Sequence, residues 1–208
     1  MSVRTKMTSQ DRRAAIVRES VRLFSRHGFR GTTTREIANA VGVSEPVLYQ
    51  HFATKNDLYS AIIDSKSREG QQKFLSVLTP FMETQDDEGF FRELAEQILA
   101  WYIDDPAYIR LILFSSLEGH ELSRLCYERQ AIVYFRFVSS YIERRIAQGA
   151  FREMDPLVAA RAFAGMIGHY AMGRVIFPCD LLRDHSPSQV IHQMVEIFLS
   201  GIRKKTRD

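Results

Sequence analysis

The 208-residue sequence predicts an all-α fold. Apolar residues recur at helical spacing along most of the chain. Asp105-Pro106, Asp155-Pro156 and Ser186-Pro187 each join a capping residue to a proline, which is typical of helix starts. No segment shows the sustained alternation, rich in β-branched residues, that indicates strands, and no repeat of 30–50 residues indicates a solenoid.

A basic amphipathic helix and two short helices are predicted in the N-terminal part. Over residues 11–27 the apolar side chains share one helical face and the arginines the other. Thr33 with Glu36 forms a capping-box pattern, and Ser44 ahead of Pro46 is a second helix start. These signals predict a helix from Thr33 to Val41 and another through Tyr49.

The pair Gly42-Val43 is predicted to form a tight turn between the two short helices. In a helix-turn-helix the second helix enters the DNA major groove while the first crosses the backbone. Periodicity alone leaves a generic three-helix packing unit as the alternative. The apolar residues expected to pack the two helices together are Ile37, Ala38, Val41, Val43 and Leu48.

Longer helices are predicted beyond this region. Thr54 with Asp57 repeats the capping box and begins a helix from Lys55 towards Phe81. The remaining helices are expected at 87–103, 107–117, 120–148, 156–176 and 187–204.

Charge is distributed unevenly along the chain. The net charge is +3, but residues 1–54 carry nine Lys and Arg against four acids, so this first quarter holds +5 and the rest −2. This asymmetry indicates a polyanion partner for the N-terminal part, such as double-stranded DNA. The alternative is an ordinary solvated basic helix face.

Composition excludes several other classes. With 45% hydrophobic residues the chain is too apolar to be disordered. No apolar run approaches the roughly 18 residues of a membrane helix, and residues 1–10 show no secretory signal. Cys126 and Cys179 form no CxxC pair and indicate a reducing compartment. We therefore expect a cytoplasmic protein without a membrane partner.

Residues 12–60 carry a family resemblance without gaps. The matching positions are Ile16-Val17, Leu23-Phe24, His27-Gly28-Phe29, Thr32 to Ala38, Gly42-Val43-Ser44, Leu48 to Phe52, Lys55 and Leu58. This stretch closely resembles the DNA-binding domain of the TetR (tetracycline-repressor-like) family. The resemblance implies a homodimeric transcriptional regulator, usually a repressor, that a small ligand releases from a palindromic operator. It also implies a DNA-binding domain at 1–54 and a ligand-binding and dimerisation domain at 55–208.

The resemblance extends to individual DNA-binding residues. Those matching the family's phosphate contacts are Thr33, Thr34, Tyr49, His51 and Lys55. Those matching positions near base edges or neighbouring phosphates are Arg35, Ser44, Glu45, Val47 and Gln50. Glu45 departs in character, because phosphate repels an acid; it either accepts from a cytosine N4 or balances the helix dipole. Arg4 and Lys6 are further candidates for neutralising phosphate.

Residues 74–177 are rich in large aromatic and sulfur-containing side chains. Most are expected to form a helical core, whereas a subset lining an apolar pocket would suit a small lipophilic effector. The candidates for this subset are Trp101, Tyr102, Phe114, Tyr127, Phe163, Met166, His169 and Tyr170. His169 would need a hydrogen-bond partner on an apolar helix, either in the core or on a ligand.

The last two predicted helices suggest how the chain pairs with itself. A stripe of small residues on one and surplus apolar residues on the other resemble the family's dimer interface, a four-helix bundle with two helices from each subunit. The alternative is that both helices pack within one chain. The candidate interface residues are Ala160, Ala164, Gly168, Ala171, Val190, Met194, Ile197 and Phe198.

An enzyme finds little support in the sequence. It contains no GxGxxG, GxxxxGK[ST] or GxSxG motif. His120-Glu121 begins like a zinc-binding HExxH, but Arg124 replaces the second histidine. Cys126 has bulky neighbours and is expected to be a buried thiol rather than a nucleophile. We expect no catalysis, cofactor or metal; a helical protein-binding adaptor that does not bind DNA is the remaining alternative.

Overall fold

The computed structural model describes residues 8–119, 123–124, 127–177 and 184–204, without the side chains of 67–73 and 130. Within these residues the chain is helical and holds no named strand, and one isolated antiparallel bridge joins Phe151 to Arg203. The predicted all-α class is confirmed. No helix in the described part of the chain is long and apolar enough to cross a membrane.

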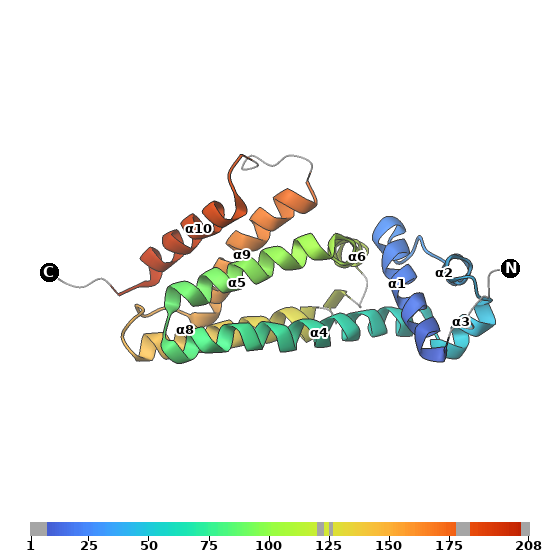
Figure 1. Cartoon of the computed structure of the whole chain (residues 1–208), viewed down its shortest axis with the longest axis horizontal. Coiled ribbons are helices and arrows are strands. Elements are labelled where there is room, and N and C mark those ends of the chain that lie inside the picture. The colour runs from blue at the N-terminus through green and yellow to red at the C-terminus, as the bar shows by residue number, and fades with distance from the viewer. Residues whose placement is uncertain (1–7, 120–122, 125–126, 178–183, 205–208) are drawn as a thin grey trace. The chain divides into compact units, whose positions relative to one another are not determined.

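The order of the helices follows the predicted order closely (Figure 1). The elements are α1 (Ser9–His27), α2 (Thr34–Val41), α3 (Glu45–His51), α4 (Lys55–Thr84), α5 (Asp87–Asp104), α6 (Pro106–Leu117), a π-helical turn η1 (Tyr127–Ala131), α8 (Ile132–Ala147), α9 (Pro156–Val175) and α10 (Pro187–Ile202). The single helix expected over 120–148 is seen as η1 followed by α8. Its expected start lies partly outside the described residues, as do Arg4, Lys6, His120, Glu121, Cys126 and Cys179.

Side-chain caps begin most of these helices, as the sequence predicts. Thr33 and Glu36 form the expected capping box at α2, and Asp155 accepts two backbone N–H groups at the start of α9. Ser44 does not follow the prediction, because its side chain makes no capping hydrogen bond at α3. Pro46 contributes to this difference, since it occupies the second helical position and has no N–H to donate.

The helices form two compact units. The first holds the described residues of Met1–Arg68 and Ala107–Tyr127, and the second those of Glu69–Pro106 and Glu128–Asp208. The helix α4 contributes to both. This division does not follow the expected boundary at residue 54, because Leu58 of α4 and Leu111 of α6 are buried in the core of the first unit.

Aromatic rings fill the centre of the first unit. Phe24, Phe29 and Tyr59 pack against one another, with ring centroids 5.6 Å apart in each pair. The hydroxyl of Tyr59 donates to the carbonyl of Leu111 over 3.3 Å, which joins α4 to α6. The burial of Ile16, Phe24, Ile37, Ala38, Leu48, Phe52, Leu58 and Tyr108 completes this core.

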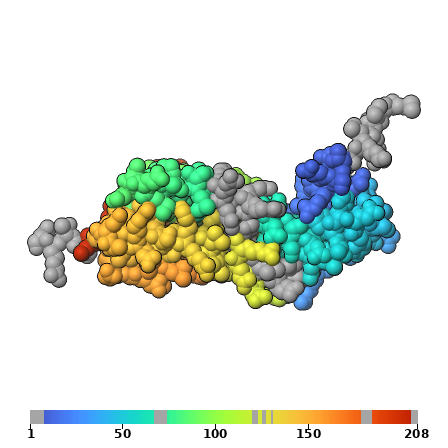
Figure 2. Space-filling view, turned by 90° about the horizontal axis from the view of Figure 1, so that it is seen from below, coloured from blue at the N-terminus to red at the C-terminus, as the bar shows by residue number. Residues whose placement is uncertain are grey.

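A second aromatic core holds the second unit together. Phe91 of α5, Phe163 of α9 and Phe198 of α10 lie with their ring centroids 4.9 Å apart in each pair. The helix α9 contacts both α5 and α8, and in Figure 2 the yellow surface of α8 passes directly into the orange of α9. The helices α5, α9 and α10 therefore share one buried aromatic core.

The small-residue stripe of α9 is partly buried within the chain itself. Ala160 and Ala171 are buried in the core of their own chain. A Cβ added at Gly168 would lie 3.6 Å from the hydroxyl of Tyr102, so this glycine faces α5. Val190 and Phe198 of α10 are buried as well, whereas Ala164 and Met194 are half-buried and Ile197 is exposed. Small side chains permit close packing between helices, and at Ala160, Gly168 and Ala171 the neighbours belong to the same chain.

Candidate DNA-binding surface and effector region

The turn between α2 and α3 has the geometry that the sequence predicts. Gly42 adopts the left-handed conformation with φ 77°, and its N–H donates to Ala38 and Asn39. A glycine adopts this conformation without a Cβ penalty. Ile37 and Leu48 are fully buried, which confirms that they pack the two helices together. Burial of Leu48 leaves its neighbours Tyr49 and Gln50 exposed on the outer face of α3.

The ten predicted DNA-binding residues all lie in the first unit, and none of them is buried. The exposed members are Thr33, Arg35, Ser44, Tyr49 and Gln50; the half-buried members are Thr34, Glu45, Val47, His51 and Lys55. This arrangement offers hydroxyl, amide and cationic groups to a partner, which are the groups that contact phosphates and base edges.

Three of these side chains form a cluster that links α2 to α3. The hydroxyl of Thr34 donates to Glu45 Oε1 over 2.7 Å, and its oxygen lies 3.2 Å from the hydroxyl oxygen of Tyr49. Glu45 was expected to contact a base or balance a helix dipole. The structure adds a contact that neither expectation includes, a hydrogen bond across the turn.

Lys55 places a positive charge at the start of α4. Its Nζ lies 4.1 Å from the ring centroid of Phe29, a cation–π geometry. Burial lowers the pKa of Lys55, while the negative charges of Glu118 and Glu36 oppose that shift. The ring of Phe29 and the negative charges of Glu118 and Glu36 therefore stabilise the Lys55 side chain at the start of α4.

Glu36 is fixed on α2 by its own capping box. Its carboxylate accepts from the backbone N–H of Thr33 over 2.7 Å and from the hydroxyl of Thr33 over 2.9 Å. These two hydrogen bonds lower the pKa of Glu36, the backbone bond most. The hydroxyl of Thr33 is thus engaged at the N-terminus of α2, where a phosphate would approach.

Glu118 is a residue of this unit that the sequence analysis did not single out. Its carboxylate, just beyond α6, accepts from the backbone N–H of Phe29 over 3.2 Å and of Arg30 over 3.3 Å. Gly28 precedes these donors at φ 71° and ψ 176°, and a Cβ there would collide with Glu118 Oε1. The partners are 88 and 89 residues apart, so no local sequence signal could have revealed the contact.

The eight predicted effector residues are divided between the two units. Phe114 and Tyr127 belong to the first unit and the others to the second. Phe163 and Tyr170 are buried, and Phe163 is a core residue between Phe91 and Phe198. Tyr102 and Met166 are half-buried, whereas Trp101, Phe114, Tyr127 and His169 are exposed.

Three of these side chains have environments that the sequence did not predict. His169 is exposed on α9, so it is not the core histidine that the sequence allowed, and its contact with a ligand stays a prediction. The hydroxyl of Tyr170 accepts from Arg174 Nη1 over 3.1 Å, one turn along the same helix. Burial raises the pKa of Tyr102, whose ring makes an edge contact with Trp101.

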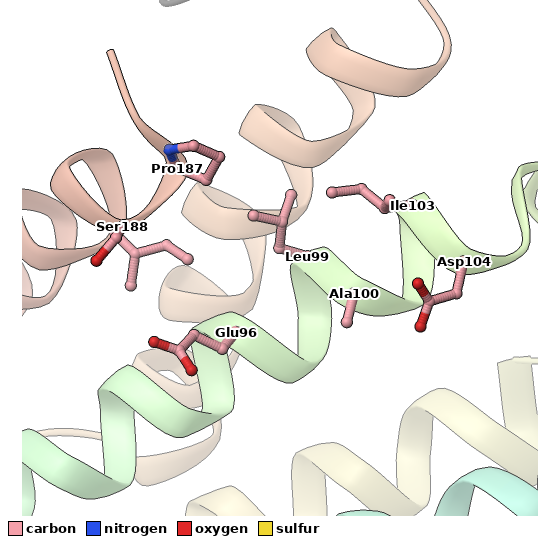
Figure 3. A pocket seen from close by; sticks show the side chains of 8 residues that line it. Glu96, Leu99, Ala100, Ile103, Asp104, Pro187 and Ser188 are labelled. Carbon is pink, nitrogen blue, oxygen red and sulfur yellow. The ribbon is translucent and has the colours of Figure 1, made fainter.

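A pocket of about 330 Å³ lies between α5 and α10 of the second unit (Figure 3). Its lining combines apolar side chains with two carboxylates: Glu96, Leu99, Ala100, Ile103, Asp104, Pro187, Ser188 and Ile191. None of the eight predicted residues lines this pocket. The sequence could not place it, because its residues lie about 90 positions apart and carry no shared motif.

A helix-turn-helix on a basic helical platform, joined to a second helical unit, defines a class of DNA-binding transcriptional regulators. Family comparison agrees with this class. Residues 16–62 match the model of bacterial regulatory proteins of the tetR family, and residues 90–201 match the C-terminal domain of the AefR-like transcriptional repressors. The second match alone spans more than half of the chain, so the chain belongs to the TetR family.

Individual relatives place the similarity in both units. The HTH-type transcriptional regulator AcrR of Shigella flexneri is 42% identical over 62 residues, which are 30% of this chain and 29% of the relative. A crystal structure of a TetR-family regulator from Mesorhizobium loti has a TM-score of 0.72 at 23% identity, over 96% of this chain and 100% of the other. The flavonoid-responsive regulator FrrA has a TM-score of 0.66 at 26% identity, over 95% and 100%.

Proposed function

We propose that the protein is a homodimeric repressor that binds a palindromic operator and is released by a small lipophilic effector. The observation that carries this proposal is the outer face of α3, where Tyr49 and Gln50 are exposed. A helix with such a face reads the major groove, and a palindrome requires two such helices related by two-fold symmetry. Family membership supports each part of the proposal.

The ten residues that match the family's contacts have separable roles in this proposal. Thr33, Thr34, Tyr49, His51 and Lys55 contact phosphates, which position the protein without reading sequence. Gln50 reads a base edge, because its amide can pair with adenine N6 and N7. With two or three phosphates neutralised by each subunit, a dimer gives a slope of log K against log salt of roughly −4 to −6.

The effector is proposed to bind in the second unit. Two features support a lipophilic ligand there: the half-buried Tyr102 beside Trp101, and the largely apolar pocket between α5 and α10. FrrA, a regulator with the same fold, is described as flavonoid-responsive. A lipophilic aromatic compound is therefore a suitable first class of ligand to screen.

The effector is proposed to act through α4, which begins at Lys55 and contributes to both units. A shift of this helix would change the spacing between the two recognition helices of a dimer. Coupling free energies between such sites are typically 1–3 kcal/mol. Spin labels at Arg26→Cys, after both native cysteines are changed to serine, would measure the spacing. An unchanged distance between operator-bound and effector-bound dimers would contradict this coupling.

The DNA-binding part of the proposal is tested with the purified full chain. Binding to a random DNA library, followed by sequencing of the retained fraction, should return a palindrome. Gel shifts on that operator and on random DNA should then show that Lys55→Ala weakens both complexes alike, whereas Gln50→Ala changes the preferred sequence.

A matched control separates these effects from a general loss of positive charge. Lys204→Ala removes the same charge from an exposed residue of the second unit and should leave both complexes unchanged. Failure of the library to enrich any sequence would contradict operator binding. Equal weakening of operator and random complexes by Gln50→Ala would remove Gln50 from base recognition.

A further inference from the structure

We propose that Glu45 is a specificity-determining residue. Its carboxylate keeps the hydroxyl hydrogens of Thr34 and Tyr49 away from phosphate until the amino group of a cytosine takes the place of the Thr34 hydroxyl as the donor to Glu45. The inference rests on the proposed function, because it concerns how operator DNA is distinguished from other DNA. It depends on the cluster formed by these three side chains.

The hydrogen bonds of the cluster have a defined direction. The hydroxyl of Thr34 has one hydrogen, which it donates to Glu45 Oε1 over 2.7 Å. The contact of 3.2 Å between the Thr34 and Tyr49 oxygens must then use the hydrogen of Tyr49, with the oxygen of Thr34 accepting. Donation therefore runs from Tyr49 to Thr34 to Glu45, and both hydroxyl hydrogens are consumed inside the protein.

This direction matters because both hydroxyls belong to the proposed phosphate contacts. A hydroxyl donates to a phosphate oxygen only if its hydrogen is free. Hydrogen bonds to a carboxylate are stronger than those between neutral groups, so Glu45 competes effectively for the hydrogen of Thr34. DNA of any sequence must break this arrangement before the two hydroxyls can contact its backbone.

A suitable base pair can compensate for the broken hydrogen bond. Cytosine presents its N4 amino group as a donor in the major groove, and a carboxylate is the side chain that accepts from it. An amino group that donates to Glu45 Oε1 competes with the Thr34 hydroxyl for that oxygen, and where it displaces Thr34 the hydroxyls of Thr34 and Tyr49 are released to phosphate. Where another base stands at that position, the carboxylate either keeps Thr34 or loses its donor, and binding is weaker.

Two substitutions at Glu45 separate this hydroxyl effect from simple charge repulsion. Glu45→Ala removes the charge and the acceptor together, whereas Glu45→Asp keeps the charge but shortens the side chain away from Thr34. Both variants are expected to bind random DNA about threefold to tenfold more tightly in gel shifts. A gain for Glu45→Ala alone would identify charge repulsion as the cause and overturn the proposal.

The base contact is tested by scanning each operator position. The unmodified chain should show one position in each half-site where replacing cytosine weakens binding about tenfold, and Glu45→Ala should abolish that preference. Thr34→Val in the same scan should weaken the cytosine-containing operators more than the others and so reduce the preference, because only there is its hydroxyl released to phosphate; an unchanged preference would overturn the proposed coupling between Thr34 and Glu45. Circular dichroism melting of each variant shows that the compared chains are folded.

The outcomes distinguish this inference from the proposed function. If the unmodified chain binds no DNA sequence preferentially, operator binding itself fails. If it binds an operator but Glu45→Ala keeps the full base preference, only the role of Glu45 fails.

Discussion

The carboxylate of Glu118 accepts the backbone N–H of Phe29 over 3.2 Å, which ties the end of α6 to the loop between α1 and α2. The N–H of Arg30 donates to the same carboxylate, and the charge of Glu118 acts on Lys55. One side chain therefore organises the loop ahead of the helix-turn-helix and a proposed phosphate contact.

Replacing Glu118 by glutamine should weaken both the first unit and its binding to DNA. The neutral amide makes poorer hydrogen bonds to the two backbone N–H groups, so we expect the free energy of unfolding to fall by about 1–2 kcal/mol. Affinity for operator and random DNA should fall alike, because base contacts are untouched. Denaturant titration and gel shifts measure the two effects. Glu153→Gln, an exposed acid of the second unit, should change neither value.

Gly28→Ala should destabilise the chain by about 1–3 kcal/mol, because φ 71° with ψ 176° is a conformation that only glycine adopts readily. The new Cβ would also collide with Glu118 Oε1. The double variant Gly28→Ala/Glu118→Ala has no collision but keeps the backbone strain. Its loss in free energy of unfolding should therefore be smaller than the sum of the two single losses, although part of the loss caused by Gly28→Ala should remain. Gly165→Ala is the matched control: its Cβ would meet no atom within 4 Å. Equal stability of Gly28→Ala and the control would refute the strain argument.

Local signals explain what could be predicted from this sequence. Thr33 and Glu36, three residues apart, cap α2, and Leu48 lies at a position where the helical spacing of apolar residues predicts burial. Both features were therefore predictable from neighbouring residues. The contact between Glu118 and Phe29 spans 89 residues and is set by tertiary packing. The small residues Ala160 and Ala171 indicated a close helix partner, but their spacing cannot tell whether that partner belongs to the same chain.

Asp87→Asn should destabilise the second unit more than the loss of a charge from an exposed ion pair does. Arg145 donates to Asp87 through Nε over 2.8 Å and through Nη2 over 2.9 Å, and only 11% of each side chain is exposed. Removing one charge leaves the other without its partner, so we expect a loss of about 3 kcal/mol in denaturant titration. Glu88→Gln, in the exposed pair with Arg92, is the control and should cost at most about 1 kcal/mol. Comparable losses would show that burial of the pair has little effect.

The hydrogen bond between Tyr141 and Asp87 predicts that the free energy of unfolding falls at alkaline pH. Burial raises the pKa of Tyr141 above its ordinary value of 10.0, and its hydrogen bond to Asp87 raises it further. Above about pH 10 the unfolded chain releases this proton while the folded chain retains it, so the unfolded state binds fewer protons and stability falls as pH rises. Unfolding titrations between pH 8 and 11, within the range where the chain refolds, should show that slope. Tyr141→Phe should reduce it, and an unchanged slope would assign it to other groups.

Ile197→Glu should separate the subunits of the proposed homodimer without unfolding the chain. Ile197 is 65% exposed on α10, while its neighbour Phe198 is only 7% exposed in the core. A carboxylate at such a surface costs little in a monomer, but it would be costly in an apolar interface between two copies. Sedimentation should therefore show a monomer, and operator affinity should fall with a salt slope about half that of the dimer. Val133→Glu introduces the same charge at an exposed position of α8 and should leave the dimer intact. If Ile197→Glu sediments as the unmodified chain does, this face of α10 is not the dimer interface.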